Sequence, residues 1–381
     1  MFRSFTQSRD IRGEVMINGK TIAVVVKTYN EETQIGRVIE TMPNFVDRII
    51  IVNDCSKDKT SEVVAKYMEK YNPSDIVISK PDKSIKRSIY NEADFISEEL
   101  SKKEIERMTT SIVVNQNPES DKIILINHTV NGGAGATTAT GYMWCRNYEI
   151  DCTAVMDGDG QMDPGELQSI CEPVVNEGID YVKGNRLIHK AAHIVIPKSR
   201  YFGNSVLSML TKIASGYWHI SDSQTGYTAI SLSALESIDI PGIYKSYGVP
   251  NDILAKLNIA YCTIREVPIK PVYRVGEQSK MKIYKVIPRL SFLLVKLFFK
   301  RLWTKYFLRD FHPVFLFYNF SFLTGILSIP FLINIIYILI TEGRATSQGI
   351  YTAFLVLALA SLQSLGFAMW MDITDNERLN K

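Results

Sequence analysis

Closely spaced cysteine pairs are absent from this chain of 381 residues, and none of its cysteines belongs to a cysteine–histidine motif. Zinc sites normally show such spacing, and disulfide frameworks are typical of secreted domains. We therefore expect no disulfide and no zinc, only reduced thiols in a cytosolic domain. The five cysteines are Cys55, Cys145, Cys152, Cys171 and Cys262.

The N-terminus also lacks the apolar run of a signal peptide, because its first residues include Arg3, Arg9 and Asp10. We expect the only membrane-anchoring segment to lie on the C-terminal side. The net charge is +3, and the basic residues in excess lie beside apolar C-terminal segments. Nucleic acid is therefore not an expected partner.

Charged residues are nearly missing from residues 312–371. Two apolar runs there, Val314–Ile340 and Gly349–Met371, each exceed the roughly 20 helical residues that cross a bilayer core. A buried core hairpin is the alternative, but helices of globular cores rarely stay apolar on every face. The short link between the runs predicts a transmembrane hairpin whose flanks lie on one side of the bilayer.

Residues 270–309 contain eleven Lys or Arg and one acidic residue, Glu277. By the positive-inside rule this flank, the large N-terminal domain and both termini lie in the cytoplasm. Tyr284–Leu308 interleaves apolar residues with cations, which is typical of an amphipathic helix on anionic lipid; a solvated basic helix packed on the domain is the alternative. The cations are Lys285, Arg289, Lys296, Lys300, Arg301, Lys305 and Arg309.

From Thr21 onward the sequence repeats strand, loop and helix, which predicts an α/β fold with a parallel sheet. Residues 75–122 interrupt the repeat with a polar stretch, interpreted as an insertion with one helix over Glu92–Arg107. The expected strands are Ile22–Val26, Arg48–Val52, Ile123–Ile126, Cys152–Met156 and Tyr227–Ser231, and helices are expected after Thr33 and over Thr60–Tyr71 and Ala134–Arg146.

The segments that follow four of these strands carry the polar residues of interest. Ligands of open α/β sheets bind beyond the carboxyl ends of the strands. We therefore expect these segments to meet at one edge of the sheet. They are residues 28–31, 53–56, 132–135 and 157–161.

Asp157 and Asp159 directly follow an expected buried strand. Two such carboxylates suit Mg²⁺ or Mn²⁺ held against a diphosphate, because hard cations prefer oxygen ligands and keep positions open for phosphate. Gln161 adds a neutral oxygen. A D-x-D triplet alone mostly marks a turn, so the metal interpretation depends on the preceding strand and on Pro164 at the next helix start.

Tyr29 and Glu31 follow the first strand, and Asp54 follows the second. Either Tyr29 stacks on a nucleobase while the two carboxylates accept hydrogen bonds from base or ribose, or these segments form a helix start and a turn. The small residues of Asn131–Ala136 either let the backbone approach a ligand or make a tight turn. They match neither the phosphate-loop nor the dinucleotide fingerprint.

Further along, Asp222 precedes a short apolar strand and would lie opposite the two aspartates. Arg274 and Lys280 lie at the entrance of the basic helix, where a lipid phosphate would meet the protein; ordinary membrane-surface charge is the alternative. Arg186 and Arg200 are weaker candidates for the same anion.

Four motifs follow one another along the chain: Lys27–Glu32, Val52–Ser56, Asp157–Gln161 and Tyr273–Lys280. In this order they resemble family 2 glycosyltransferases, in particular the dolichyl- or polyprenyl-phosphate hexose synthases. The resemblance spans about residues 20–310 apart from the insertion, and it implies a GT-A fold, an inverting mechanism and Mg²⁺ or Mn²⁺. Lys27, where many relatives have proline or alanine, and the long insertion depart from the family pattern.

The resemblance also implies roles for the matching residues. Nucleotide-sugar binding would fall to Thr28, Tyr29, Glu31, Asp54, Asp157, Gly158, Asp159 and Arg186. The metal ligands would be Asp157, Asp159 and Gln161, and the lipid phosphate would bind Arg200, Arg274 and Lys280. The catalytic set would be Asp159, Asp222, Arg274 and Lys280, with Asp222 as base or sugar-positioning group.

The expected reaction moves a hexose from a UDP- or GDP-linked sugar to a polyprenyl or dolichyl phosphate. The alternatives are another lipid or a polysaccharide acceptor, or a non-catalytic nucleotide-sugar-binding membrane scaffold. The sequence leaves the sugar, the nucleotide, the lipid and homo-oligomer formation open. The expected parts are a GT-A domain over 1–280, an amphipathic segment over 281–311, the hairpin over 312–371 and a cytoplasmic tail over 372–381.

Overall fold

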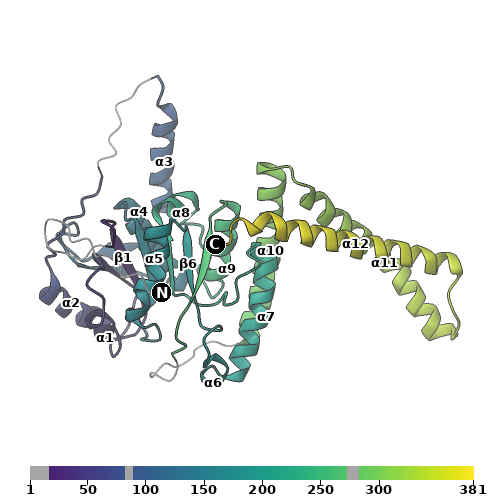
Figure 1. Ribbon diagram of the computed structural model, residues 1–381, viewed down its shortest axis with the longest axis horizontal. Coiled ribbons are helices and arrows are strands. Elements are labelled where there is room, and N and C mark those ends of the chain that lie inside the picture. The colour runs from purple at the N-terminus through teal and green to yellow at the C-terminus, as the bar shows by residue number, and fades with distance from the viewer. Residues whose placement is uncertain (1–16, 82–88, 273–282) are drawn as a thin grey trace, which may run out of the picture.

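The computed structural model describes residues 17–81, 89–272 and 283–381 (Figure 1). Eight strands form one mixed sheet in the order β3-β4-β2-β1-β5-β7-β6-β8. The strands are β1 Ile22–Thr28, β2 Arg48–Asn53, β3 Ser111–Val113, β4 Ile123–His128, β5 Cys152–Asp157, β6 Tyr181–Asn185, β7 Thr228–Ser231 and β8 Ile264–Pro268.

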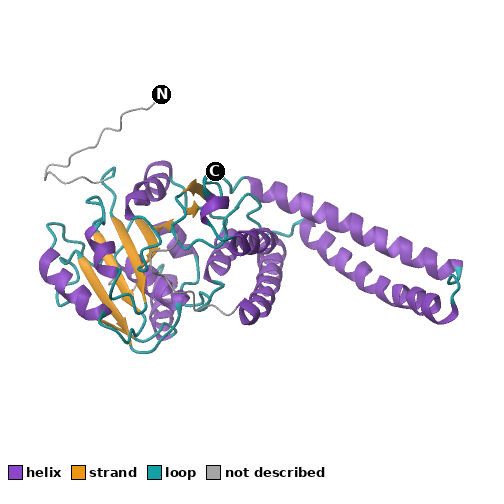
Figure 2. Ribbon diagram, turned by 90° about the horizontal axis from the view of Figure 1, so that it is seen from below, coloured by secondary structure: helices purple, strands orange, loops and turns teal. Residues whose placement is uncertain are grey.

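Helices cover both faces of this sheet, so its central strands are apolar on both sides (Figure 2). In β1, Ala23 and Val25 pack in one buried cluster, whereas Val24 and Val26 pack in the other, because successive strand residues point to opposite faces. The helices of the globular part are α1 Ile35–Glu40, α2 Thr60–Tyr71, α3 Glu92–Glu106, α4 Ala134–Asn147, a 3₁₀ turn Pro164–Glu166, α5 Leu167–Glu177, α6 Ala192–Val195, α7 Lys198–Ser215, α8 Leu232–Ser237 and α9 Val249–Ile259.

The strands β4, β2, β1 and β5 run parallel, as the strand, loop and helix repeat predicts. The predicted α/β class is confirmed, and the expected strands and helices of the globular part lie within two residues of the observed bounds. The antiparallel partners β3 and β7 make the sheet mixed rather than wholly parallel.

The insertion carries the predicted helix, α3, which has no buried residue. It also carries β3, a strand that the sequence does not predict, because the three residues Ser111–Val113 are exposed and too few for a pattern. The buried Arg48 fastens both ends of the insertion. Its Nη2 donates to the carbonyls of Ile76 and Glu119 at 2.6 and 2.7 Å.

The C-terminal part begins with α10 Ile283–Trp303, which lies beside α7, and a π-helical turn over Thr304–Arg309 (Figure 1). Two long helices, α11 Pro313–Glu342 and α12 Gln348–Glu377, then project from the domain as an antiparallel pair. Both are long and apolar enough to cross a membrane. Between the two helices, the Ser321 and Ser361 hydroxyls each donate to the other residue's carbonyl at 2.9 Å.

A buried polar cluster joins the base of this hairpin to the globular domain. Arg301 of α10 and Asp372 of α12 are fully buried and form two hydrogen bonds of 2.7 Å, and Tyr306 donates to the same carboxylate at 2.7 Å. Nearby, Lys305 Nζ donates to Asn376 at 2.5 Å. Two cations of the expected amphipathic segment, Arg301 and Lys305, are therefore interior residues.

The chain end, predicted as a tail over 372–381, is helical to Glu377 and then docks on the sheet. The Ile264 amide of β8 donates to the Leu379 carbonyl at 2.7 Å, and the Lys381 amide donates back to Ile264 at 3.0 Å. The Leu379 side chain is buried in the core. The hairpin is thus attached to the domain at both of its ends.

Candidate functional site

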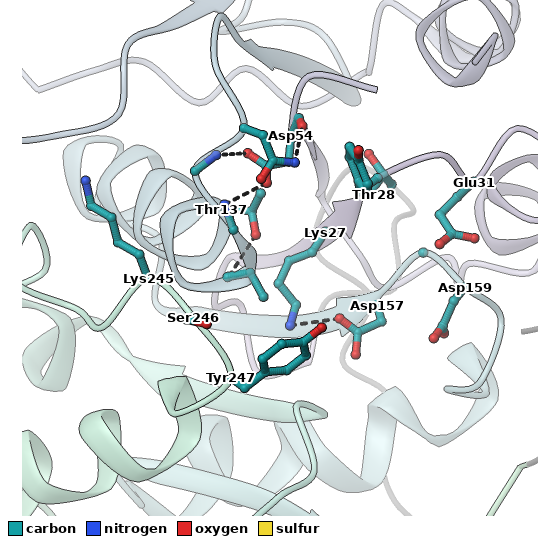
Figure 3. A pocket seen from close by; sticks show the side chains of 16 residues that line it. Lys27, Thr28, Glu31, Asp54, Thr137, Asp157, Asp159, Lys245, Ser246 and Tyr247 are labelled. Carbon is teal, nitrogen blue, oxygen red and sulfur yellow. Dashed lines mark hydrogen bonds and ion pairs between the residues drawn. The ribbon is translucent and has the colours of Figure 1, made fainter. Parts of the chain in front are cut away.

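The candidate site is a pocket of about 540 Å³ at the carboxyl ends of β1, β2, β4 and β5 (Figure 3). All four segments expected to meet at this edge contribute to its wall. Parallel strands place their carboxyl ends side by side, which explains the convergence. The lining residues are Lys27, Thr28, Tyr29, Glu31, Asp54, Asn131, Gly132, Gly133, Ala134, Thr137, Asp157, Gly158, Asp159, Lys245, Ser246 and Tyr247.

Asp54 holds the glycine-rich turn in place from beneath. Its two carboxylate oxygens accept the amides of Gly132 and Gly133, each at 2.8 Å, and His128 Nδ1 lies 2.7 Å from Oδ1. Burial raises the pKa of Asp54, but the hydrogen bonds from His128 and the two glycine amides outweigh burial and hold the pKa below its ordinary value. Asp54 is thus an ionised anchor whose remaining surface faces the pocket.

The glycine-rich turn also packs closely against residues 243–247. Gly133 has a φ of +84°, which favours glycine, and the Gly135 amide donates to the Lys245 carbonyl at 3.2 Å. A Cβ on Gly135 would lie 1.9 Å from the Tyr244 carbonyl oxygen. This close approach brings Lys245, Ser246 and Tyr247 into the pocket wall.

The turn after β1 is held by the loop after β2 and by the first residue of α2. The Asn30 amide donates to Ser56 Oγ at 2.9 Å, and the Glu31 amide donates to Thr60 Oγ1 at 2.9 Å. Asn30 adopts a left-handed φ of +57°, which asparagine tolerates. Tyr29 and Glu31 therefore stand on a fixed turn at the rim of the pocket.

Asp157 ends β5 directly opposite Lys27 of β1, and Lys27 Nζ lies 2.8 Å from Asp157 Oδ1. Asp159 Oδ1 accepts a hydrogen bond from the backbone amide of Gln161 at 3.0 Å. Asp157 and Asp159 line the pocket, whereas Gln161 is not among its lining residues within the described part of the chain. Two carboxylates beside open space suit a divalent cation that takes its other ligands from a phosphate, so this donor set fits Mg²⁺ or Mn²⁺.

Asp222 lies outside the pocket wall, fully buried, and it holds Arg186. The guanidinium donates to both carboxylate oxygens at 2.8 and 3.0 Å. Burial raises the pKa of Asp222, but the charge and hydrogen bonds of Arg186 outweigh burial and keep the pKa low. Its backbone amide donates to Glu266 at 3.0 Å. The geometry makes Asp222 a positioning residue for Arg186.

Residues 23–93 and 103–239, together more than half of the chain, match the family described as glycosyl transferase family 2. The chain belongs to glycosyltransferase family 2. A UDP-N-acetylglucosamine–dolichyl-phosphate N-acetylglucosaminyltransferase of Methanococcus voltae is 30% identical over 258 residues, which cover 67% of this chain and 86% of that protein. The family and the resemblance predicted from the motifs are thereby confirmed.

Two further similarities concern a more distant relative and a solved structure. An undecaprenyl-phosphate mannosyltransferase of Micrococcus luteus is 29% identical over 164 residues, 43% of this chain and 66% of that protein. Glucosyl-3-phosphoglycerate synthase from Mycobacterium tuberculosis, solved with Mn²⁺ and UDP-glucose, has a TM-score of 0.45 at 15% identity, covering 74% of this chain and 79% of that chain.

In this family 2 glycosyltransferase, three of the predicted site residues lie where their side chains are not described. Arg274 and Lys280 fall outside the described residues, and Arg200 belongs to α7 but its side chain is not described. The predicted lipid-phosphate contacts therefore stay predictions.

The sequence reasoning missed five lining residues: Lys27, Thr137, Lys245, Ser246 and Tyr247. Lys27 stood out only as a departure from the family pattern, although a lysine in an otherwise apolar strand is itself a signal. Lys245, Ser246 and Tyr247 gave no signal, because they lie far along the chain from the other lining residues and only the fold brings them near.

We predict that Gly135→Ala weakens donor binding at least about tenfold, because the added Cβ must push the Tyr244 backbone away and shift the pocket wall. The KM for the nucleotide sugar, measured in steady state, checks this. Gly203→Ala is the matched control, since a Cβ at Gly203 meets nothing within 4 Å. Equal KM values for the two variants would contradict the prediction.

A second prediction concerns acid stability. Because the pKa of Asp222 is depressed in the folded protein, its contribution is complete above the ordinary aspartate pKa of about 3.9 and is lost as the pH falls through the folded-state pKa. Asp222→Asn should cost about 2–3 kcal/mol of unfolding free energy at pH 7 and progressively less below about pH 4. Urea unfolding in detergent at several pH values measures the difference.

The control for this series is Asp239→Asn, since Asp239 is about half exposed and its contacts lie at the surface: a 3.4 Å pair with Arg107 and a 3.3 Å hydrogen bond from the Gly242 backbone amide. A cost of Asp222→Asn that is equal at pH 7 and below pH 4 would show that the Asp222 charge does not stabilise the fold.

Proposed function

We propose that this protein transfers a hexose, with inversion, from a nucleotide sugar to a polyprenyl or dolichyl phosphate. The observation that carries the proposal is the combination of a D-x-D pocket with an apolar two-helix hairpin fixed to the same domain. The relatives act on dolichyl phosphate and undecaprenyl phosphate, as their names state. A lipid acceptor needs an enzyme held at the membrane, and the hairpin provides that attachment.

The pocket supports the proposed donor contacts. Tyr29 at the rim offers a ring for the nucleobase, and Glu31 and Asp54 offer carboxylates for base or ribose hydrogens. Thr28 and Gly158 line the pocket and would bring backbone close to the donor. Arg186, which Asp222 orients and which is not a described lining residue of the pocket, is proposed to lie near the donor. These roles are proposals for this chain.

Asp157 and Asp159 are the proposed metal ligands, with Gln161 as a third oxygen. When bound, Mg²⁺ or Mn²⁺ would neutralise the leaving nucleoside diphosphate. The chain itself orients the carboxylates: β5 carries Asp157, and the backbone amide of Gln161 donates to Asp159. The end of β5 and the turn after it therefore orient these two carboxylates before the substrate arrives.

On the acceptor side, a phosphate monoester is mostly dianionic at pH 7, because its second pKa is about 6, and it needs little help from a base. Arg200, Arg274 and Lys280 are proposed to bind it. Exposed apolar residues of α10, such as Phe292 and Val295, support a helix lying at the membrane surface. The positive flank supports the proposed cytoplasmic position of the domain and both termini.

The deciding experiment incubates the full-length protein in detergent with polyprenyl phosphate, Mn²⁺ and separate nucleotide sugars, among them UDP-N-acetylglucosamine, UDP-glucose and GDP-mannose. Mass spectrometry of the lipid should show one lipid-monophosphate sugar. Release of nucleoside diphosphate without a lipid product would place the acceptor elsewhere. No lipid product and no donor turnover with any sugar would contradict the proposal.

A further inference from the structure

A lysine stands at the D-x-D carboxylates, in a strand that is otherwise nearly all apolar. Lys27 is the sixth residue of β1, and its Cα is the register partner of Asp157 in β5. Because the two residues are direct neighbours on adjacent parallel strands, their side chains leave the sheet on the same face. Lys27 Nζ and Asp157 Oδ1 are 2.8 Å apart.

Backbone walls this ion pair on one side. A Cβ on Gly226 would lie 3.4 Å from Lys27 Nζ and 3.5 Å from Asp157 Oδ2, so the chain at Gly226 passes close to both charges. The fully buried Lys183 donates to the neighbouring Thr225 carbonyl and so holds this stretch of backbone in place. Lys27 and Asp157 both line the pocket, which is where the pair opens.

The other lysine of the pocket wall is placed differently. In Figure 3 the Lys27 ammonium points at Asp157 and the Tyr247 ring projects toward this pair, whereas the Lys245 side chain points away from it. Among the described lining residues there are thus two lysines, but only Lys27 has its charge at the D-x-D carboxylates.

This placement has opposite consequences for a cation and for an anion. A divalent cation on Asp157 would share the carboxylate with an ammonium, and like charges at such close range repel. A diphosphate at the same place would be attracted both by the divalent cation and by the ammonium of Lys27. Each ligand should then bind poorly before the other one is present.

We propose that Lys27 makes metal and nucleotide binding interdependent: it pairs with Asp157 before the donor binds, and it turns to the donor diphosphate once nucleotide and metal are both present. The proposal rests on the proposed function, since it takes a nucleoside diphosphate and a divalent cation as the ligands. It assigns to Lys27 a phosphate-binding role that also sets the order in which the pocket fills.

The test uses the full-length protein in detergent and three variants, Lys27→Met, Lys27→Arg and Lys245→Met. Electron paramagnetic resonance counts free Mn²⁺ with and without UDP, and calorimetry measures UDP binding with and without Mn²⁺; GDP is run in parallel. Methionine keeps most of the length of lysine without its charge. Arginine keeps the charge, and Lys245→Met removes one lysine from the same wall.

Lys27→Met should bind Mn²⁺ alone about tenfold more tightly, and bind UDP about tenfold more weakly when Mn²⁺ is present. The factor by which either ligand improves the other must fall equally from both directions, because the two binding equilibria are linked. Lys27→Arg should keep this factor near the wild-type value, and Lys245→Met should change it less than about threefold.

Unchanged Mn²⁺ affinity in Lys27→Met, or equal effects of Lys27→Met and Lys245→Met, would overturn the inference. The proposed function would still stand in that case, provided that the wild type binds the nucleotide with Mn²⁺. If the wild type bound neither UDP nor GDP with Mn²⁺, the proposed function itself would fail, and the inference with it. Thermal unfolding shows whether Lys27→Met is folded; if it is not, Lys27→Gln replaces it in the same comparison.

Discussion

Asp159→Ala should lower turnover by a factor of at least about 10³ while the protein stays folded. The divalent cation would lose one of its carboxylate ligands and could no longer neutralise the charge that develops on the leaving diphosphate. Asp159 lines the pocket, and its carboxylate is held by the Gln161 amide at 3.0 Å. The side chain is no part of the buried core, so its removal should hardly change stability. The lipid-product assay over a range of Mn²⁺ concentrations measures the loss.

Asp163→Ala is the matched control for this variant. Asp163 lies four residues further on in the same loop, caps the 3₁₀ turn by accepting the Gly165 amide at 2.9 Å, and is not a described lining residue of the pocket. It should keep turnover within about threefold, since the change removes a cap worth about 1 kcal/mol and an exposed 3.6 Å ion pair with Lys270, which contributes little. Near-normal turnover of Asp159→Ala at high Mn²⁺ would rule out Asp159 as a metal ligand.

Arg301→Met should destabilise the protein by about 3–5 kcal/mol, because it leaves the carboxylate of Asp372 buried without its partner. Both side chains are fully buried, and their two hydrogen bonds of 2.7 Å join α10 to α12. The same guanidinium donates to the carbonyls of Ala214 and Ile213 at the end of α7. Denaturant unfolding in detergent measures the change.

Two controls separate the buried charge from other effects. Replacing both partners, Arg301→Met with Asp372→Leu, should recover most of the loss, because no charge is then left unpaired. Arg107→Met breaks an exposed pair with Asp239, 3.4 Å apart, and should change stability by less than about 1 kcal/mol. A double variant as unstable as Arg301→Met would show that packing, and not the unpaired charge, causes the loss.

The site was predictable to the extent that it depends on strand ends. Residues such as Tyr29, Asp54 and Asp157 follow recognisable apolar strands, and parallel strands bring such positions together whatever the rest of the fold does. Lys245 and Tyr247 follow no strand of that kind. They reach the pocket because Gly135 lets the Tyr244 backbone approach the glycine-rich turn, which is a contact between distant segments.

The same reason explains the interior cations. In a helical pattern, Arg301 and Lys305 look like the other positive residues of a membrane-surface helix, because the pattern records spacing and not the neighbouring element. Their burial depends on Asp372 and Asn376, which lie 71 positions further on in each case. A sequence pattern within one helix contains no information about such a partner.

The sequence by itself determined the α/β class, the family, the D-x-D motif and the two apolar helices, because strand alternation, local motifs and apolar runs are properties of neighbouring residues. Tertiary structure alone decided that Asp222 holds Arg186, that Lys27 pairs with Asp157, and that the chain end docks on β8. Each of these is a contact between segments far apart in the chain, and only the packing of the whole fold brings such segments together.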